Sequence, residues 1–374
     1  MVTEAQTIDI EGSLEMMEQH LASRLRNTYR QDTFDMDDVP EAQVLASFPG
    51  LKAALQWTEE NVTVPWRAAD AAALHSQSEH RLLARVAISA GVAAIVLAIV
   101  HLAVNITARR LIDLALALEV LAVVAAVVAV TVGLRAKFNH QWLGQRHRAE
   151  QLRKLKFSAL VQLSIPNPGW QRGIAEKLQT IDNVLDFARV EDWSKGGDVD
   201  PEMPTVSNSN PQSGDFRAVV LYYRYKRILF QADYFKRRRE DYQRETGGWR
   251  HRADLPAFFL SVFFVLAHFA AQLWSAYVHQ SPGLEKAAIW CVALAAIIPV
   301  LGVGAHAWVD AFELPRSASL FAAKHRALLV AATRLQQDSG DVLATLGHMC
   351  RIEHFLEHEH REWLRLLLDA KWFI

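Results

Sequence analysis

Residues 82–104 read LLARVAISAGVAAIVLAIVHLAV, and after a short polar turn residues 111–134 read LIDLALALEVLAVVAAVVAVTVGL. Each stretch is close to the roughly 20 residues with which an α-helix crosses about 30 Å of hydrocarbon. The pattern returns as LPAFFLSVFFVLAHFAAQLWSAYV at residues 255–278 and AAIWCVALAAIIPVLGVGAHAWVDA at residues 287–311. Two such pairs predict an all-α integral membrane protein. Its four spans, at about 82–105, 111–134, 255–278 and 287–311, form two hairpins.

The composition of the whole chain conceals this pattern. Of the 374 residues 22% are charged, the net charge is −1 and the mean hydropathy is +0.04, all of which are ordinary values for a soluble protein. The charged residues are concentrated outside the spans, in segments long enough to form a helical layer. Net charge therefore indicates little about partners.

The basic residues beside the spans predict their orientation. The turn of the first hairpin carries Arg109 and Arg110 and that of the second carries Lys286, whereas seven basic residues lie between Lys236 and Arg252. Because lysine and arginine are retained on the cytoplasmic side, both termini and the central region should be cytoplasmic. The two cysteines, one of them inside a span, offer no disulfide framework.

The segments outside the spans have helical periodicity. Apolar residues between 142 and 163 recur at helical spacings, and a second helix is expected at 170–190. The run at 194–215 is rich in Gly, Pro, Ser, Asn and Asp, as a flexible linker is. A long helix should then lead into the third span, with an interruption at Gly247 and Gly248.

These elements predict a repeated plan of approach helix, hairpin, return helix and terminal helix. Whether duplication or two independent hairpins produced it stays open, because the similarity lies in the order of elements more than in the residues. The expected divisions are an N-terminal cytoplasmic helical segment at 1–64, a two-span unit at 65–193, the linker at 194–215 and a second two-span unit at 216–374.

Four stretches carry a resemblance to a known family. They are PWRAADAAALHSQSEHRLLARVAI from residue 65, HQWLGQRHRAEQLRKLKF from residue 140, RILFQADYF from residue 227 and IEHFLEHEHREWLRLLL from residue 352. Together they resemble the membrane regions of bacterial two-span effectors of the SLATT kind, over about 65–193 and 217–372. The chain differs from the simplest members in having two hairpins, an additional N-terminal segment and no recognisable nucleotide-sensing domain.

The resemblance implies a function in bacterial conflict. Such an effector would sit in the inner membrane as a homo-oligomer and would permeabilise the bilayer or conduct ions when triggered. The trigger would be a nucleotide signal or a separate nucleotide-signalling partner protein. The alternative is a membrane scaffold that anchors a cytoplasmic partner and conducts nothing.

Polar residues inside the spans are the sharpest candidates for a functional site, because burying them in lipid is costly. One interpretation is a polar seam that lines an ion path in an oligomer, and the other is hydrogen bonding between helices. The candidates are His101, Asn105 and Glu119 in the first hairpin and His268, His306 and Asp310 in the second.

A basic cluster precedes the third span. It could bind the anionic group of a nucleotide or a lipid, or it could only anchor the chain by the positive-inside effect. The interleaved tyrosines are expected to pack between helices, and no nucleic-acid partner is expected. The cluster comprises Lys226, Arg227, Lys236, Arg237, Arg238 and Arg239.

Enzyme signatures are missing from the sequence. It contains no GxxxxGK[ST], GxGxxG, HExxH or GxSxG motif, so we expect neither an enzyme nor a cofactor. His354 and His358 have the i, i+4 spacing of metal ligands, with Glu357 and His360 nearby. We interpret them instead as part of a solvated helix face of mixed charge, and expect no metal site.

Overall fold

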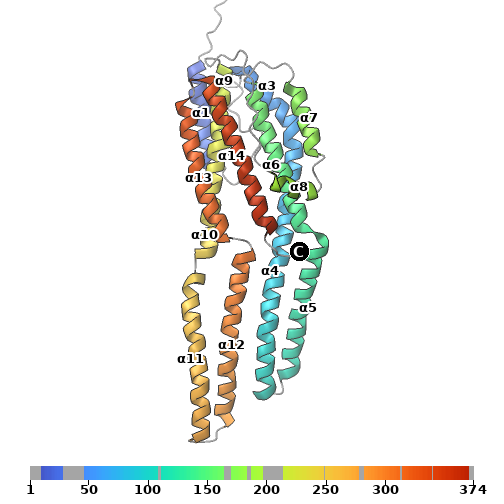
Figure 1. Ribbon diagram of the computed structural model, residues 1–374, viewed down its shortest axis with the longest axis vertical. Helices are drawn as coiled ribbons and strands as arrows, with labels where there is room; N and C mark the ends of the chain where they lie inside the picture. Colours follow the sequence, from blue (N-terminus) through green and yellow to red (C-terminus); the bar gives the residue numbers. More distant parts are fainter. Residues whose placement is uncertain are drawn as a thin grey trace, which may run out of the picture. The chain divides into compact units, whose positions relative to one another are not determined.

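The computed structural model describes residues 10–27, 46–107, 111–163, 170–182, 187–196, 214–247, 249–277, 282–311, 314–338 and 340–369. The long elements in these residues are all helices, in agreement with the all-α prediction (Figure 1). Contacts divide the chain into two compact units. Unit 1 comprises residues 1–76, 140–239 and 319–369, and unit 2 comprises residues 77–139, 240–318 and 370–374.

Each unit draws segments from both halves of the chain. The two units are groups of residues in spatial contact, whereas the predicted divisions are continuous stretches of sequence. The divisions expected at 65–193 and 216–374 therefore stay a prediction.

Unit 2 contains the apolar helices. They are the later part of α4 (Val64–Thr107), α5 (Ile112–Ala136), α11 (Trp249–Tyr277) and α12 (Pro282–Ala311). In the part of the chain that the structure describes, four helical segments are long and apolar enough to cross a membrane. Large apolar side chains such as Leu121, Phe258 and Val303 are more than half exposed along them. Such surfaces are what a bilayer covers, so the prediction of four spans is confirmed at this level.

The spans pack in pairs, α4 with α5 and α11 with α12, which Figure 1 shows as two hairpins. In the second hairpin the Ser261 hydroxyl donates a hydrogen bond of 2.8 Å to the carbonyl oxygen of Ala295. Ala288, Ala293 and Ala295 are buried in α12. Small residues at the contact let the helix backbones approach closely, as in other helical membrane proteins.

A close contact also joins α4 to α12 within unit 2. A Cβ atom built on Gly304 would lie 2.5 Å from Cγ2 of Val92, so only glycine fits there without a shift. The guanidinium of Arg85 lies 5.3 Å from the ring centroid of Trp308. The two hairpins thus meet at a glycine contact and a cation–π contact.

Unit 1 is a helical bundle whose helices come from three parts of the chain. The first part gives α1 (Ile10–Asn27), α3 (Pro49–Thr58), the π-helical segment η2 (Glu59–Thr63) and the start of α4. The middle part gives α6 (Phe138–Leu163), α7 (Trp170–Asp182), α8 (Phe187–Lys195), α9 (Gly214–Tyr223), the π-helical segment η4 (Arg224–Leu229) and α10 (Phe230–Gly247). The last part gives α13 (Leu314–Gln337) and α14 (Val342–Asp369).

The predicted helices of unit 1 match these bounds in most places. In α6 the apolar face is buried, including Leu143, Leu152 and Leu155. α10 is described as far as Gly247, and Gly248 lies outside the described residues, so the interruption expected there stays a prediction. The structure describes two helical segments, α7 and α8, where one helix was expected at 170–190. Residues 183–186 between them lie outside the described part. Most of the predicted linker, at 197–213, lies outside it too. The tyrosines Tyr222 and Tyr223 are fully buried, which confirms for these two that they pack between helices.

Candidate functional site

The first hairpin brings two of its three polar candidates together. Nδ1 of His101 on α4 lies 2.8 Å from Oε2 of Glu119 on α5. About a quarter of each side chain is exposed, at 26% and 25%. Asn105, one turn further along α4, is exposed. The pair thus joins two ionisable side chains across the first hairpin.

The polar candidates of the second hairpin are arranged differently. Nδ1 of His268 lies 3.0 Å from the carbonyl oxygen of Ala288 on the partner helix, which accepts its hydrogen bond. His306 is exposed, and the side chain of Asp310 lies outside the described residues. The His268 contact is the helix-to-helix hydrogen bond that the sequence offered as an alternative to a polar seam.

The basic cluster before the third span divides into buried and exposed members. Arg227 is 5% exposed and binds Glu353 of α14 through two hydrogen bonds, from Nε at 2.8 Å and from Nη2 at 2.6 Å. Lys226 lies beside the ring of Phe230. Arg227 is therefore paired with Glu353 inside the bundle. A site for an anion or a lipid headgroup needs accessible charges, so it would have to use the other members of the cluster.

The other members of the cluster lie on α10. Arg237 forms an ion pair of 2.8 Å with Asp233 one turn away. Arg238 lies over the ring of Tyr234, Arg239 is half-buried and Lys236 is exposed. Lys236 is thus the most accessible charge in the cluster.

Among the described residues, including the histidines of the terminal helix, no three potential metal ligands gather. Glu357 binds Lys154 of α6 and also Arg361, with 3.1 Å between the atoms of the second pair. Glu359 is 12% exposed and binds Lys324. The interpretation of this stretch as a solvated helix face is therefore wrong for these residues, although His358 is exposed.

A network of buried and half-buried charges lies within unit 1, and sequence reasoning missed it. Arg146 of α6 bonds to Asp70 of α4 at 3.0 Å and to Glu150 at 2.6 Å. Lys324 and Arg227 extend the network to α14 through the ion pairs given above. The i, i+4 recurrence of charges on α6 and α14 was its signal. That same spacing is typical of a solvated face, so the pattern alone favoured exposure.

Burial shifts the pKa of several groups in this network. It raises the pKa of Glu359 and lowers that of Lys324, and in each case the partner only partly offsets the effect. Burial raises the pKa of Tyr223 well above its ordinary value, and the Glu353 carboxylate adds to the shift. A charged side chain in this interior therefore costs free energy unless it is paired. Ion pairs as well as apolar contacts hold the helices together.

A pair of histidines packs beside this network. Nδ1 of His147 lies 3.2 Å from Nε2 of His360, and the two rings are stacked, with Trp193 of α8 against both. Burial lowers the pKa of His147 to about 4 and that of His360 well below its ordinary value. Both imidazoles are therefore neutral near pH 7, and one donates its N–H to the other.

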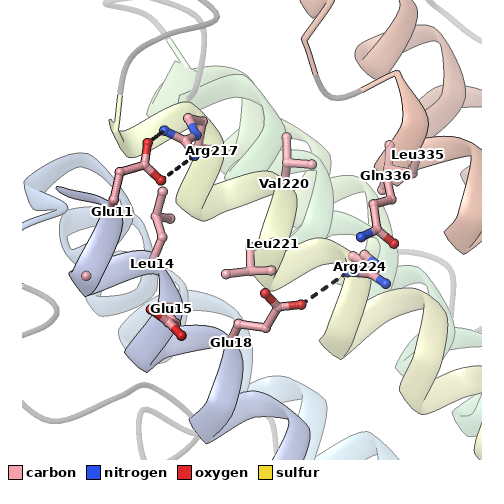
Figure 2. Close-up of a pocket in the computed structure, with 11 residues that line it drawn as sticks. Glu11, Leu14, Glu15, Glu18, Arg217, Val220, Leu221, Arg224, Leu335 and Gln336 are labelled. Carbon is pink, nitrogen blue, oxygen red and sulfur yellow. Dashed lines mark hydrogen bonds and ion pairs between the residues drawn. The ribbon is translucent and has the colours of Figure 1, made fainter.

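Unit 1 also contains an open pocket of about 650 Å³ against α1, α9 and η4 (Figure 2). Two ion pairs cross it, from Arg217 to Glu11 at 2.5 Å and from Arg224 to Glu18 at 3.4 Å. Its apolar lining includes Leu14, Val220, Leu221 and Leu335. Since both arginines are paired with carboxylates, the pocket is not arranged to hold the phosphates of a nucleotide.

Comparison of the chain with known protein families, with curated proteins and with solved structures finds no match.

Proposed function

We propose that this protein is an oligomeric effector of the bacterial inner membrane that belongs to a defence or conflict system. It permeabilises the bilayer or conducts ions when a nucleotide signal or a nucleotide-signalling partner protein acts on its helical layer. The excess of lysine and arginine around the spans supports a cytoplasmic location for that layer and for both termini. The resemblance to two-span effectors supports the class of system.

The observation that carries the proposal is the His101–Glu119 pair. It lies in helices whose most apolar stretches are only 6% buried, and about a quarter of each side chain would face lipid in a monomer. An ionisable side chain at the centre of a membrane helix costs about 2.5–3.5 kcal/mol on insertion scales. A second copy or a water-filled path against this face would remove much of that cost, which is why we favour a conducting oligomer.

The test is the membrane potential of bacterial cells that produce the protein together with the products of its neighbouring genes. Induction should depolarise the cells, and Glu119→Leu should abolish the effect while the protein still inserts. Glu285→Leu is the matched control, because Glu285 is an exposed carboxylate in the first turn of α12. If induced cells keep their potential and liposomes containing the protein pass neither ions nor dye, the proposal fails.

The second candidate is a non-conducting scaffold that anchors a cytoplasmic partner. The pocket of about 650 Å³ in unit 1 favours it, because its apolar lining and paired charges suit a protein segment. Leu221→Glu would place a charge on that lining (Figure 2). A scaffold would lose a co-purifying partner in this variant, and its cells would stay polarised throughout.

A further inference from the structure

The His101–Glu119 pair lies inside the hydrocarbon layer rather than at its edge. His101 is six residues before the end of α4 at Thr107, and Glu119 is seven residues after the start of α5 at Ile112. At about 1.5 Å per residue both lie about 10 Å from the end of the hairpin, roughly a third of the way across the bilayer. The two helices thus place their ionisable side chains at about the same depth in the bilayer.

The chemistry of the pair suits a proton better than a metal ion. Sodium and potassium are bound by several oxygen atoms that replace their water. Here the Glu119 carboxylate oxygen lies 2.8 Å from the imidazole nitrogen of His101. A sodium or potassium ion at this carboxylate would therefore meet a nitrogen atom where it needs another oxygen. Chains of glutamate and histidine with water are, by contrast, the usual materials of proton relays in membranes.

We propose that the His101–Glu119 pair is the proton-binding site of the conducting oligomer, so that the permeant species is the proton. This inference rests on the proposed function. In one transfer Nε2 of His101 takes a proton from water, and the Nδ1–H bond breaks as that proton passes to the Glu119 carboxylate. Glu119 then releases the proton to water on the other side. The His101 ring rotates about its Cβ–Cγ bond, gives up the Nε2 proton and takes one at Nδ1, both by exchange with water on the entry side, and so regains its first tautomer. One proton crosses and no oxidant or other reactant is needed.

The experiment uses the full-length protein in liposomes of phosphatidylethanolamine and phosphatidylglycerol, with the products of its neighbouring genes added as the source of the trigger. A pH dye is trapped inside, and a potassium gradient with valinomycin drives proton entry. The parent should acidify the interior, whereas Glu119→Gln and His101→Gln should reduce the rate to that of protein-free liposomes. Thr107→Val is the control, because the Thr107 hydroxyl donates its hydrogen bond to the carbonyl oxygen of Ala103 in its own helix. It should conduct like the parent.

A double variant separates proton exchange from packing. His101→Glu combined with Glu119→His keeps both groups in reversed positions and should regain proton entry. Single variants that conduct protons at the parental rate, or a double variant as silent as the single ones, would overturn the inference. Passage of potassium or dye without protons would overturn it too and leave the proposed function standing. A parent that passes nothing would instead refute the proposed function.

Discussion

At the scale of single residues, the interior of unit 1 is held together by pairs of groups that are costly when alone. Glu359 with Lys324 and Glu353 with Arg227 join α14 to its neighbours. Removing one partner of such a pair typically costs about 3–5 kcal/mol, while replacing both by apolar residues is often neutral. The pairs therefore specify which helices meet more than they add to stability.

The buried histidines give the first prediction at this scale. His147 is 2% exposed and its pKa in the folded state is about 4, below the 6.5 of an exposed imidazole. The unfolded chain therefore binds more protons, so stability is complete above the unfolded value and is lost as the pH falls toward 4. Between about pH 7 and about pH 5 the loss through His147 should be about 2 kcal/mol.

Thermal unfolding in detergent at a series of pH values measures this effect. His147→Phe should remove part of the acid sensitivity, whereas His358→Gln, at an exposed position on α14, should leave it unchanged. An identical dependence on pH in the parent and in His147→Phe would contradict the assignment.

At the scale of elements, the helices that lead into the two hairpins share a feature. The π-helical segment η2 precedes the first hairpin and η4 precedes the second. Each inserts wider turns into an otherwise α-helical approach, and such segments are uncommon. The agreement supports a repeated plan of elements, as the sequence suggested, although it does not decide how the repeat arose.

The contact between α4 and α12 gives a prediction at the same scale. Gly304→Ala should lower the stability of unit 2 by about 1–3 kcal/mol, because the new Cβ would meet Val92 at 2.5 Å. Gly302→Ala is the matched control, since nothing lies within 4 Å of a Cβ at that position. Unfolding by a denaturing detergent should separate the two variants. Equal stability would mean that the hairpins do not meet at Gly304.

At the scale of the whole molecule, the orientation in the membrane can be tested directly. A version with Cys291 and Cys350 replaced by serine would receive single cysteines at Thr107, Ser281 or Ser209. A membrane-impermeant thiol reagent added to intact cells should label the first two positions and not the third, because the positive-inside rule leaves only the hairpin turns outside. Labelling at Ser209 would reverse the orientation that we propose.

The sequence by itself determined the helical class and the number, length and pairing of the spans. Each of these follows from a local property, the run of about 20 apolar residues that a bilayer requires. It also named His101 and Glu119, because an ionisable residue in such a run is conspicuous.

Only the tertiary structure decided which polar groups meet. His101 contacts Glu119, His268 contacts the backbone carbonyl oxygen of Ala288, and Arg227 is buried and binds Glu353. Charges spaced one turn apart look the same on a solvated face and on a buried one. What separates the two is the helix that packs against them, which in unit 1 comes from a distant part of the chain.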